Sequence, residues 1–165
     1  MAENNIKPIL SPNDKYAKSD DFELLSFFME SDSGGKVDLK NIYQNLTFVE
    51  DINTSAISGS VLIKDNNDLL NTFPISGHET ITLEFRTPGI GSDFIRFKFS
   101  VAEVTDRVRA PNERGEVYRV RFVSSTVYPN KSTKISKSFK GKISDMVKTI
   151  YNDYIGGNIE VSPKK

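Results

Sequence analysis

The sequence predicts a mainly β domain of the α+β type, built from antiparallel strands with one C-terminal helix. Three observations support this prediction. Apolar and polar residues alternate along several segments, as they do in strands that bury one face. Short runs rich in Asn, Asp, Gly and Pro separate these segments and are typical of turns. One segment near the C-terminus, residues 143–154, instead places its apolar residues at helical spacing.

The clearest strands lie at residues 56–65 and 81–85. Because side chains alternate between the two faces of a strand, each segment presents one apolar face. The residues expected on these faces are Ile57, Gly59, Val61 and Ile63 in the first strand, and Ile81, Leu83 and Phe85 in the second. Residues 65–68 read Asp-Asn-Asn-Asp, whose side chains bond to their own backbone and so favour a turn.

Further strands are predicted at residues 22–30, 38–53, 94–109 and 115–125. The last two are joined by a loop at residues 110–115, and hairpin loops of this kind favour antiparallel pairing. The residues expected to face inward are Leu46, Phe48 and Ile52 in the second of these strands, Ile95, Phe97, Phe99 and Val101 in the third, and Tyr118, Val120 and Phe122 in the fourth.

The helix is expected at about residues 142–155. Its apolar stripe consists of Ile143, Met146, Val147, Ile150, Tyr151 and Tyr154. Two glycines, Gly156 and Gly157, follow the stripe and are typical of a helix end. An amphipathic helix beside a half-covered sheet buries its stripe against that sheet. We therefore expect this helix to lie across the open side of the sheet.

Composition limits the class of protein. The length suits one domain, at residues 20–165, after a polar arm at residues 1–19 that has too little apolar surface to offset the entropy of ordering. Basic and acidic residues balance at 22 each, so no overall field favours nucleic acid or an anionic membrane. The lack of cysteine excludes disulfides and thiol chemistry. No apolar run has the length of a membrane span or a signal-peptide core, which predicts a soluble protein made in a cytoplasm.

The sequence offers little catalytic chemistry. His78 is the only histidine, which excludes a multi-histidine metal site, and it lies in a predicted turn. Residues 65–68 are consecutive acids and amides, whereas an EF-hand spaces its calcium ligands at alternate positions. Glu50 and Asp51 are neighbours that would point to opposite faces of a strand, so they make a poor catalytic pair. We predict no catalytic residues, no metal site and no cofactor.

Basic residues gather in two places. Five arginines lie on the last hairpin, and five lysines precede the helix. Acidic residues intermix with the arginines, so a solvated strand face or a protein contact is favoured over phosphate binding. The arginines are Arg107, Arg109, Arg114, Arg119 and Arg121, and the lysines are Lys131, Lys134, Lys137, Lys140 and Lys142.

Several stretches, taken in order, carry a family resemblance. They are EDINTSAISGSVLIKD at residues 50–65, NDLL at 67–70, FPISGHE at 73–79, FVSS at 122–125, KISKSFKGKISDMV at 134–147 and IYND at 150–153. This series resembles the first domain of the baseplate central hub proteins of T-even-like contractile-tailed bacteriophages. The likeness extends over about residues 22–161, and its motifs are structural rather than catalytic.

The resemblance implies a tail-tube-like fold, with antiparallel sheets or a barrel and a flanking helix. It implies a non-enzymatic virion protein of the tail baseplate that joins the tail tube to the central spike. Hub proteins of this family carry two such domains and form trimeric rings with pseudo-sixfold symmetry. This chain holds one such domain, so we expect a fragment of a longer hub protein or a shorter relative, in a ring that is a trimer or a hexamer.

The partners implied are the tail tube, spike and baseplate wedge proteins, with no membrane and no sequence-specific nucleic-acid binding, although phage DNA would pass through the ring lumen. Open edges of the strands at residues 94–109 and 115–125 would then pair with neighbouring subunits. The interface residues expected at the hairpin tip are Asp106, Arg107, Arg109, Glu113 and Arg114. An alternative hypothesis is a stand-alone β-sandwich module that binds carbohydrate or peptide.

Overall fold

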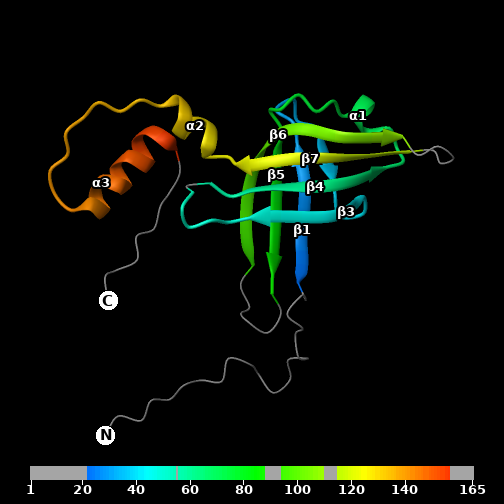
Figure 1. Ribbon diagram of the computed structural model, residues 1–165, viewed down its shortest axis with the longest axis horizontal. Helices are drawn as coiled ribbons and strands as arrows, with labels where there is room; N and C mark the ends of the chain where they lie inside the picture. The colour runs from blue at the N-terminus through cyan, green and yellow to red at the C-terminus, as the bar shows by residue number, and fades with distance from the viewer. Residues whose placement is uncertain (1–21, 55, 88–93, 110–114, 157–165) are drawn as a thin grey trace, which may run out of the picture.

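The computed structural model describes residues 22–54, 56–87, 94–109 and 115–156. Seven strands form one antiparallel sheet in the order β2-β1-β5-β6-β7-β4-β3, which confirms the predicted fold class (Figure 1). The predicted N-terminal arm lies outside the described residues. The strands are β1 (Glu23–Glu30), β2 (Lys36–Asp38), β3 (Tyr43–Val49), β4 (Ser58–Asp65), β5 (Thr80–Arg86), β6 (Ile95–Arg109) and β7 (Glu116–Ser124).

The sheet curls so that its two ends meet. The 15-residue strand β6 makes this possible, because its first part pairs with β5 and its second part pairs with β7. In Figure 1 the strands β3, β4 and β7 run across β1 and β5. Phe27 of β1 contacts Tyr43 of β3 with ring centroids 5.5 Å apart, although these strands are second and seventh in the sheet order. The result is a half-barrel.

The inner face of this half-barrel is the core. Alternation along the strands predicts most of it correctly, because the pleat places every second residue on the same face. The predicted inward residues that are buried are Val61, Ile63, Ile81, Leu83, Phe99, Val101, Tyr118, Val120 and Phe122. Gly59 also lies on this face, where an added Cβ would come within 2.7 Å of the Phe122 ring, so only glycine leaves room for that ring.

Three apolar residues on the predicted inward faces are exposed: Ile95, Ile52 and Phe48, which is 37% exposed although its ring packs against Phe85 and Phe97. Ile95 is 53% exposed because it begins β6, opposite Phe85, at the far end of the sheet. Ile52 is 99% exposed because the predicted strand over residues 38–53 divides into shorter pieces and ends at Val49. After it the chain turns, with the Asn53 amide donating to the Asp51 carboxylate at 2.8 Å. The same turn means that Glu50 and Asp51 do not lie in a strand.

The helical part contains more elements than the sequence predicted. The short helices α1 (Leu69–Thr72) and α2 (Val127–Ser132) were not predicted. The predicted C-terminal helix is confirmed as α3 (Ile143–Ile150), which continues as one π-helical segment, η1 (Tyr151–Ile155). Gly156 follows with a positive φ of 81°, which glycine adopts readily because it has no Cβ.

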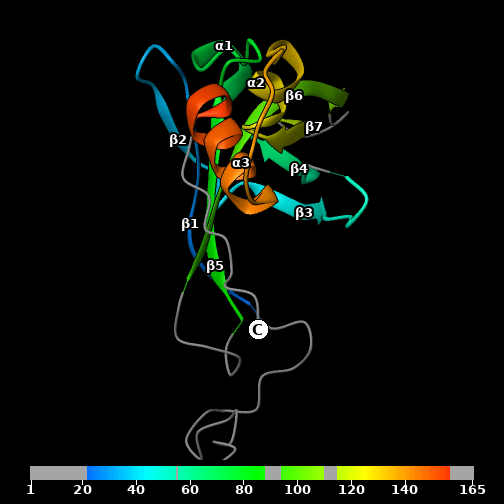
Figure 2. The same cartoon turned by 90° about the vertical axis from the view of Figure 1, so that its left-hand side faces the viewer.

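The predicted packing of α3 onto the sheet was wrong. None of its residues is buried, and Ile143 and Val147 are 74% and 39% exposed. Figures 1 and 2 show α2 and α3 beside the end of the sheet at which β7 finishes. The core is closed by the curled sheet itself, so the helix is not needed to cover it. None of the helices in the described ranges has both the length and the apolar character of a membrane span.

Candidate functional site

Three of the five charged residues predicted at the subunit interface form ion pairs within the chain. Arg107 and Arg109, both in β6, form ion pairs with Glu116 at the start of β7. The separations are 2.5 Å from Arg107 Nε to Glu116 Oε2 and 3.1 Å from Arg109 Nη2 to Oε1. The hydrogen bond from Arg107 is the main cause that lowers the pKa of Glu116, and the same bond raises the pKa of Arg107.

Asp106 is also paired within the chain. Its carboxylate accepts a hydrogen bond from Arg119 Nε at 3.0 Å. Asp106 has φ of 55° and lies where the pairing of β6 with β7 shifts, so a bulge turns its side chain toward Arg119. Glu113 and Arg114, the other two predicted interface residues, lie outside the described residues. Asp106, Arg107 and Arg109 are therefore residues of β6 whose ion pairs link this strand to β7.

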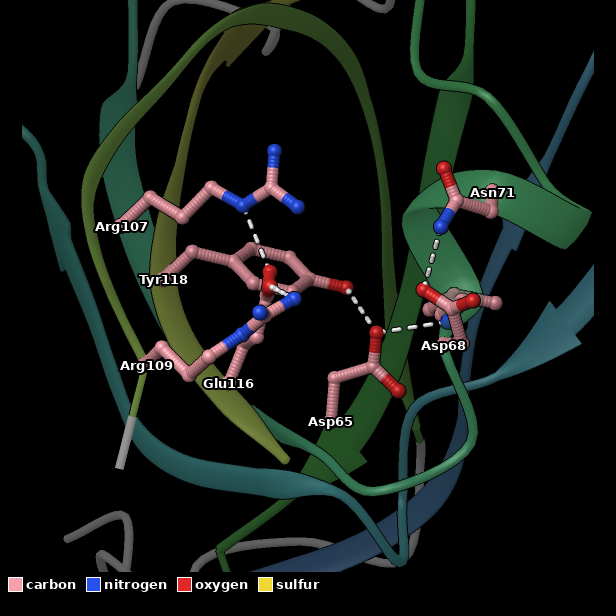
Figure 3. A network of polar contacts seen from close by, with 8 residues as sticks. Asp65, Asp68, Asn71, Arg107, Arg109, Glu116 and Tyr118 are labelled. Atoms are coloured by element: carbon pink, nitrogen blue, oxygen red, sulfur yellow. Dashed lines mark hydrogen bonds and ion pairs between the residues drawn. The ribbon is translucent and has the colours of Figure 1, made fainter. Parts of the chain in front are cut away.

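The turn after β4 contains a buried carboxylate. Asp65 is 5% exposed, and its two oxygens accept hydrogen bonds from the amides of Asn67 at 2.9 Å and Leu69 at 2.6 Å. These bonds confirm the predicted turn and place the start of α1. Figure 3 shows Asp65 close to Asp68 and Tyr118. Asp68 adopts a left-handed conformation, with φ of 59°, and its side chain accepts a hydrogen bond from Asn71 Nδ2 at 2.6 Å.

The carboxylate of Asp65 also accepts a weak hydrogen bond from the hydroxyl of Tyr118 at 3.5 Å. Burial and then the charge of Asp65 raise the pKa of Tyr118 well above its usual range, so the phenol stays protonated and remains a donor. Figure 3 shows this pair beside the Arg107–Glu116 pair at one end of the molecule. The network joins β4, β6, β7 and α1, and every acid in it has a hydrogen-bond donor, which is typical of a structural network.

A second buried carboxylate was missed by the sequence analysis. Glu79 is 1% exposed, and its oxygens accept hydrogen bonds from the amide and hydroxyl of Ser76 and from the amide of Gly77. Burial alone would raise the pKa of Glu79, but these bonds outweigh that effect and hold the pKa below its usual range. Its neighbour His78 is exposed, at the turn where the sequence predicts it.

The open edges of the sheet differ from the predicted ones. β7 pairs with β6 on one side and β4 on the other along its length, so it has no open edge to offer a neighbour, and the prediction for it was wrong. β6 pairs with β5 only as far as Ser100, so its second half has no partner on that side among the described residues. β3 is the last strand of the sheet and pairs only with β4 within the described part of the chain.

A broad hollow lies next to the end of β3. It is lined by residues 50–52, 54, 56 and 57 and by Ser124 at the end of β7. The Ser124 hydroxyl accepts a hydrogen bond from the Ile57 amide at 2.9 Å and donates one to the Ile57 carbonyl at 3.1 Å, which ties this segment to β7. Ile52, at the rim, is almost fully exposed. The hollow thus combines apolar surface with the carboxylates of Glu50 and Asp51.

Other kinds of site have less support in the described residues. The exposed aromatic side chains in the described residues are Phe22 before β1, Phe48 in β3, Tyr128 in α2 and Tyr154 in η1, and of these elements α2 and η1 contact each other. No group of three or more potential metal ligands occurs in the part of the chain that the structure describes. The sheet edges, the hollow beside β3 and the helix α3 are exposed surfaces of the described residues.

No protein-family model matches this chain, and no curated protein matches it at a significant level.

Proposed function

We propose that this chain is a non-enzymatic structural protein of a phage virion, a baseplate hub or tail-tube-like domain that joins the tail tube to the central spike. The proposal is based on the series of sequence motifs that resembles hub proteins and on the curled antiparallel sheet, which suits a tail-tube-like domain. The protein would be made in the host bacterial cytoplasm and function in the tail baseplate, next to tube, spike and wedge proteins.

The observation that carries the proposal is the open edge of β3. This seven-residue strand exposes Thr47 and Val49 on one face, and its outer backbone groups have no strand partner among the described residues. A long open edge is a hazard for a monomer unless another chain covers it. The second half of β6 offers another open edge, but shifts in its pairing with β7 make it less regular.

Two different edges on one subunit suit a ring. When β3 of one copy meets β6 of the next, each contact joins unlike surfaces, and such contacts close into a ring if the rotation between copies allows it. A trimer or a hexamer would both satisfy this arrangement, and phage DNA would pass through the lumen. Mixed charges along β6 and β7 would face a neighbour or the lumen in that ring.

A single substitution on the edge tests the proposal. Thr47→Lys places a charge in the middle of β3, where lysine discourages pairing with another strand. Ser33→Lys adds the same charge in the exposed turn between β1 and β2 and is the matched control. We expect Thr47→Lys to reduce incorporation into baseplates assembled with tube and spike proteins, while Ser33→Lys incorporates normally. Normal incorporation of both variants would exclude the β3 edge, and no incorporation of the unmodified chain would contradict the proposed function.

A further inference from the structure

An exposed basic segment connects α2 to α3. Residues 117–144 contain no Asp or Glu, and five lysines follow one another between residues 131 and 142. All five are exposed, and none forms an ion pair with a described residue. We call residues 131–142 the lysine arm. Lys131 lies in the last turn of α2, and the other four lysines follow in the irregular segment before α3.

The arm leads directly into the exposed apolar stripe of α3. Ile143 is 74% exposed and Val147 is 39% exposed, as noted above. The helical region carries Asp145, Lys148 and Asp153, so it has more acidic than basic side chains. A helix that binds a membrane surface usually carries Lys and Arg on its polar face, so this helix does not suit an anionic membrane. Nucleic acid would pair with the lysines but would leave the apolar stripe uncovered.

The hollow beside β3 has the complementary properties. Its rim carries the carboxylates of Glu50 and Asp51, neither of which forms an ion pair within the described residues, and the apolar side chain of Ile52. We call residues 50–54, 56 and 57 the turn patch. The patch and the arm lie at the same end of the sheet, because Val49 pairs with Ser58, which pairs with Val123, two residues before the segment that leads to α2.

We propose that the lysine arm and α3 of one copy dock on the turn patch of a second copy. The lysines lie against Glu50 and Asp51, and the α3 stripe covers Ile52 and the hollow. Because arm and patch lie at one end of each molecule, the arm of one copy can reach the patch of a neighbouring copy. The ten residues from 133 to 142 can span about 30 Å when extended, which allows the helix to reach a neighbour.

Cysteine cross-linking tests which copy receives the helix. The chain has no cysteine, so any disulfide comes from the introduced pair. We expect a mixture of full-length Ile52→Cys and Val147→Cys proteins to form a cross-linked dimer under mild oxidation, while each variant alone gives less of it. The matched control replaces Val147→Cys by Asn71→Cys, at an exposed site on α1 at the other end of the sheet.

Two cross-linking results would overturn the proposal. A chain that carries both Ile52→Cys and Val147→Cys and cross-links only within itself would show that α3 docks on its own patch. Absence of any cross-link above the Asn71→Cys control would show that α3 does not reach the patch at all. These experiments use the purified chain without other proteins, so their failure leaves the proposed baseplate function untouched.

Reversing charges on the lysine arm and on the turn patch tests whether the two surfaces attract each other. Lys134→Glu with Lys140→Glu should weaken self-association at least tenfold in sedimentation equilibrium at low salt, and adding Glu50→Lys to this variant should recover part of the loss. Lys40→Glu, an exposed lysine after β2, is the control and should have little effect. If the arm variant associates as well as the unmodified chain, the proposal is wrong. Binding of short DNA duplexes or anionic vesicles by the lysines, with no self-association, would also overturn it.

Discussion

Phe27 packs edge-on against Tyr43, with an angle of 80° between ring planes, and this contact joins the two ends of the sheet. An edge-on aromatic pair contributes about 0.5–1.5 kcal/mol beyond the burial of its area. We expect a double-mutant cycle of Phe27→Leu and Tyr43→Leu, measured by urea unfolding, to give a coupling energy in this range. A cycle of Phe27→Leu with Ile52→Ala, at an exposed site, should give none. Equal coupling in both cycles would mean that the pair does not close the half-barrel.

Asp65 should stabilise the turn before α1. Asp65→Ala leaves the buried amide of Leu69 without its acceptor, which costs about 1–3 kcal/mol. Asp32→Ala, at an exposed site in the turn between β1 and β2, should change the free energy of unfolding by less than about 0.5 kcal/mol. Chemical unfolding of both variants measures the difference. A loss at Asp65 no larger than at Asp32 would show that other groups hold this turn.

Glu79 should make stability depend on acid pH. Its folded pKa lies below the unfolded value of about 4.3, so its contribution is fully present above that value and is lost as the pH falls through the folded pKa. Glu79→Gln should therefore be less stable than the unmodified chain at pH 7, and the gap should narrow as the pH falls below about 4. Melting temperatures measured from pH 7 to pH 3 give this gap.

The arginines of β6 should contribute to folding as well as to any interface. Arg107→Glu places a carboxylate beside Glu116, so we expect a lower melting temperature, and the additional change Glu116→Arg should restore part of it. The deficit should shrink in high salt, because these side chains are partly exposed and salt screens them. If Arg107→Glu has the melting temperature of the unmodified chain, the Arg107–Glu116 pair is not maintained in solution. Any effect of this variant on assembly would then report on subunit contacts and not on stability.

The sequence alone determined which residues of the central strands face the core. Tyr118, Val120 and Phe122 alternate with arginines, and this alternation is a local property that the pleat of a strand converts directly into two faces. Local chemistry also determined the turn at residues 65–68 and the C-terminal helical region, α3 with η1, which ends at Gly156. In each case neighbouring residues in the chain carry all the information.

Only the tertiary structure decided how these pieces are placed. The meeting of Phe27 with Tyr43, the interior position of β7 and the exposed stripe of α3 depend on strand order, which the alternating pattern does not contain. The pairing of Arg107 with Glu116 and the burial of Glu79 depend on groups that come together only in the folded chain. The sheet curls onto itself and covers its own core. Because no apolar face of the core is left open, α3 does not pack on the sheet.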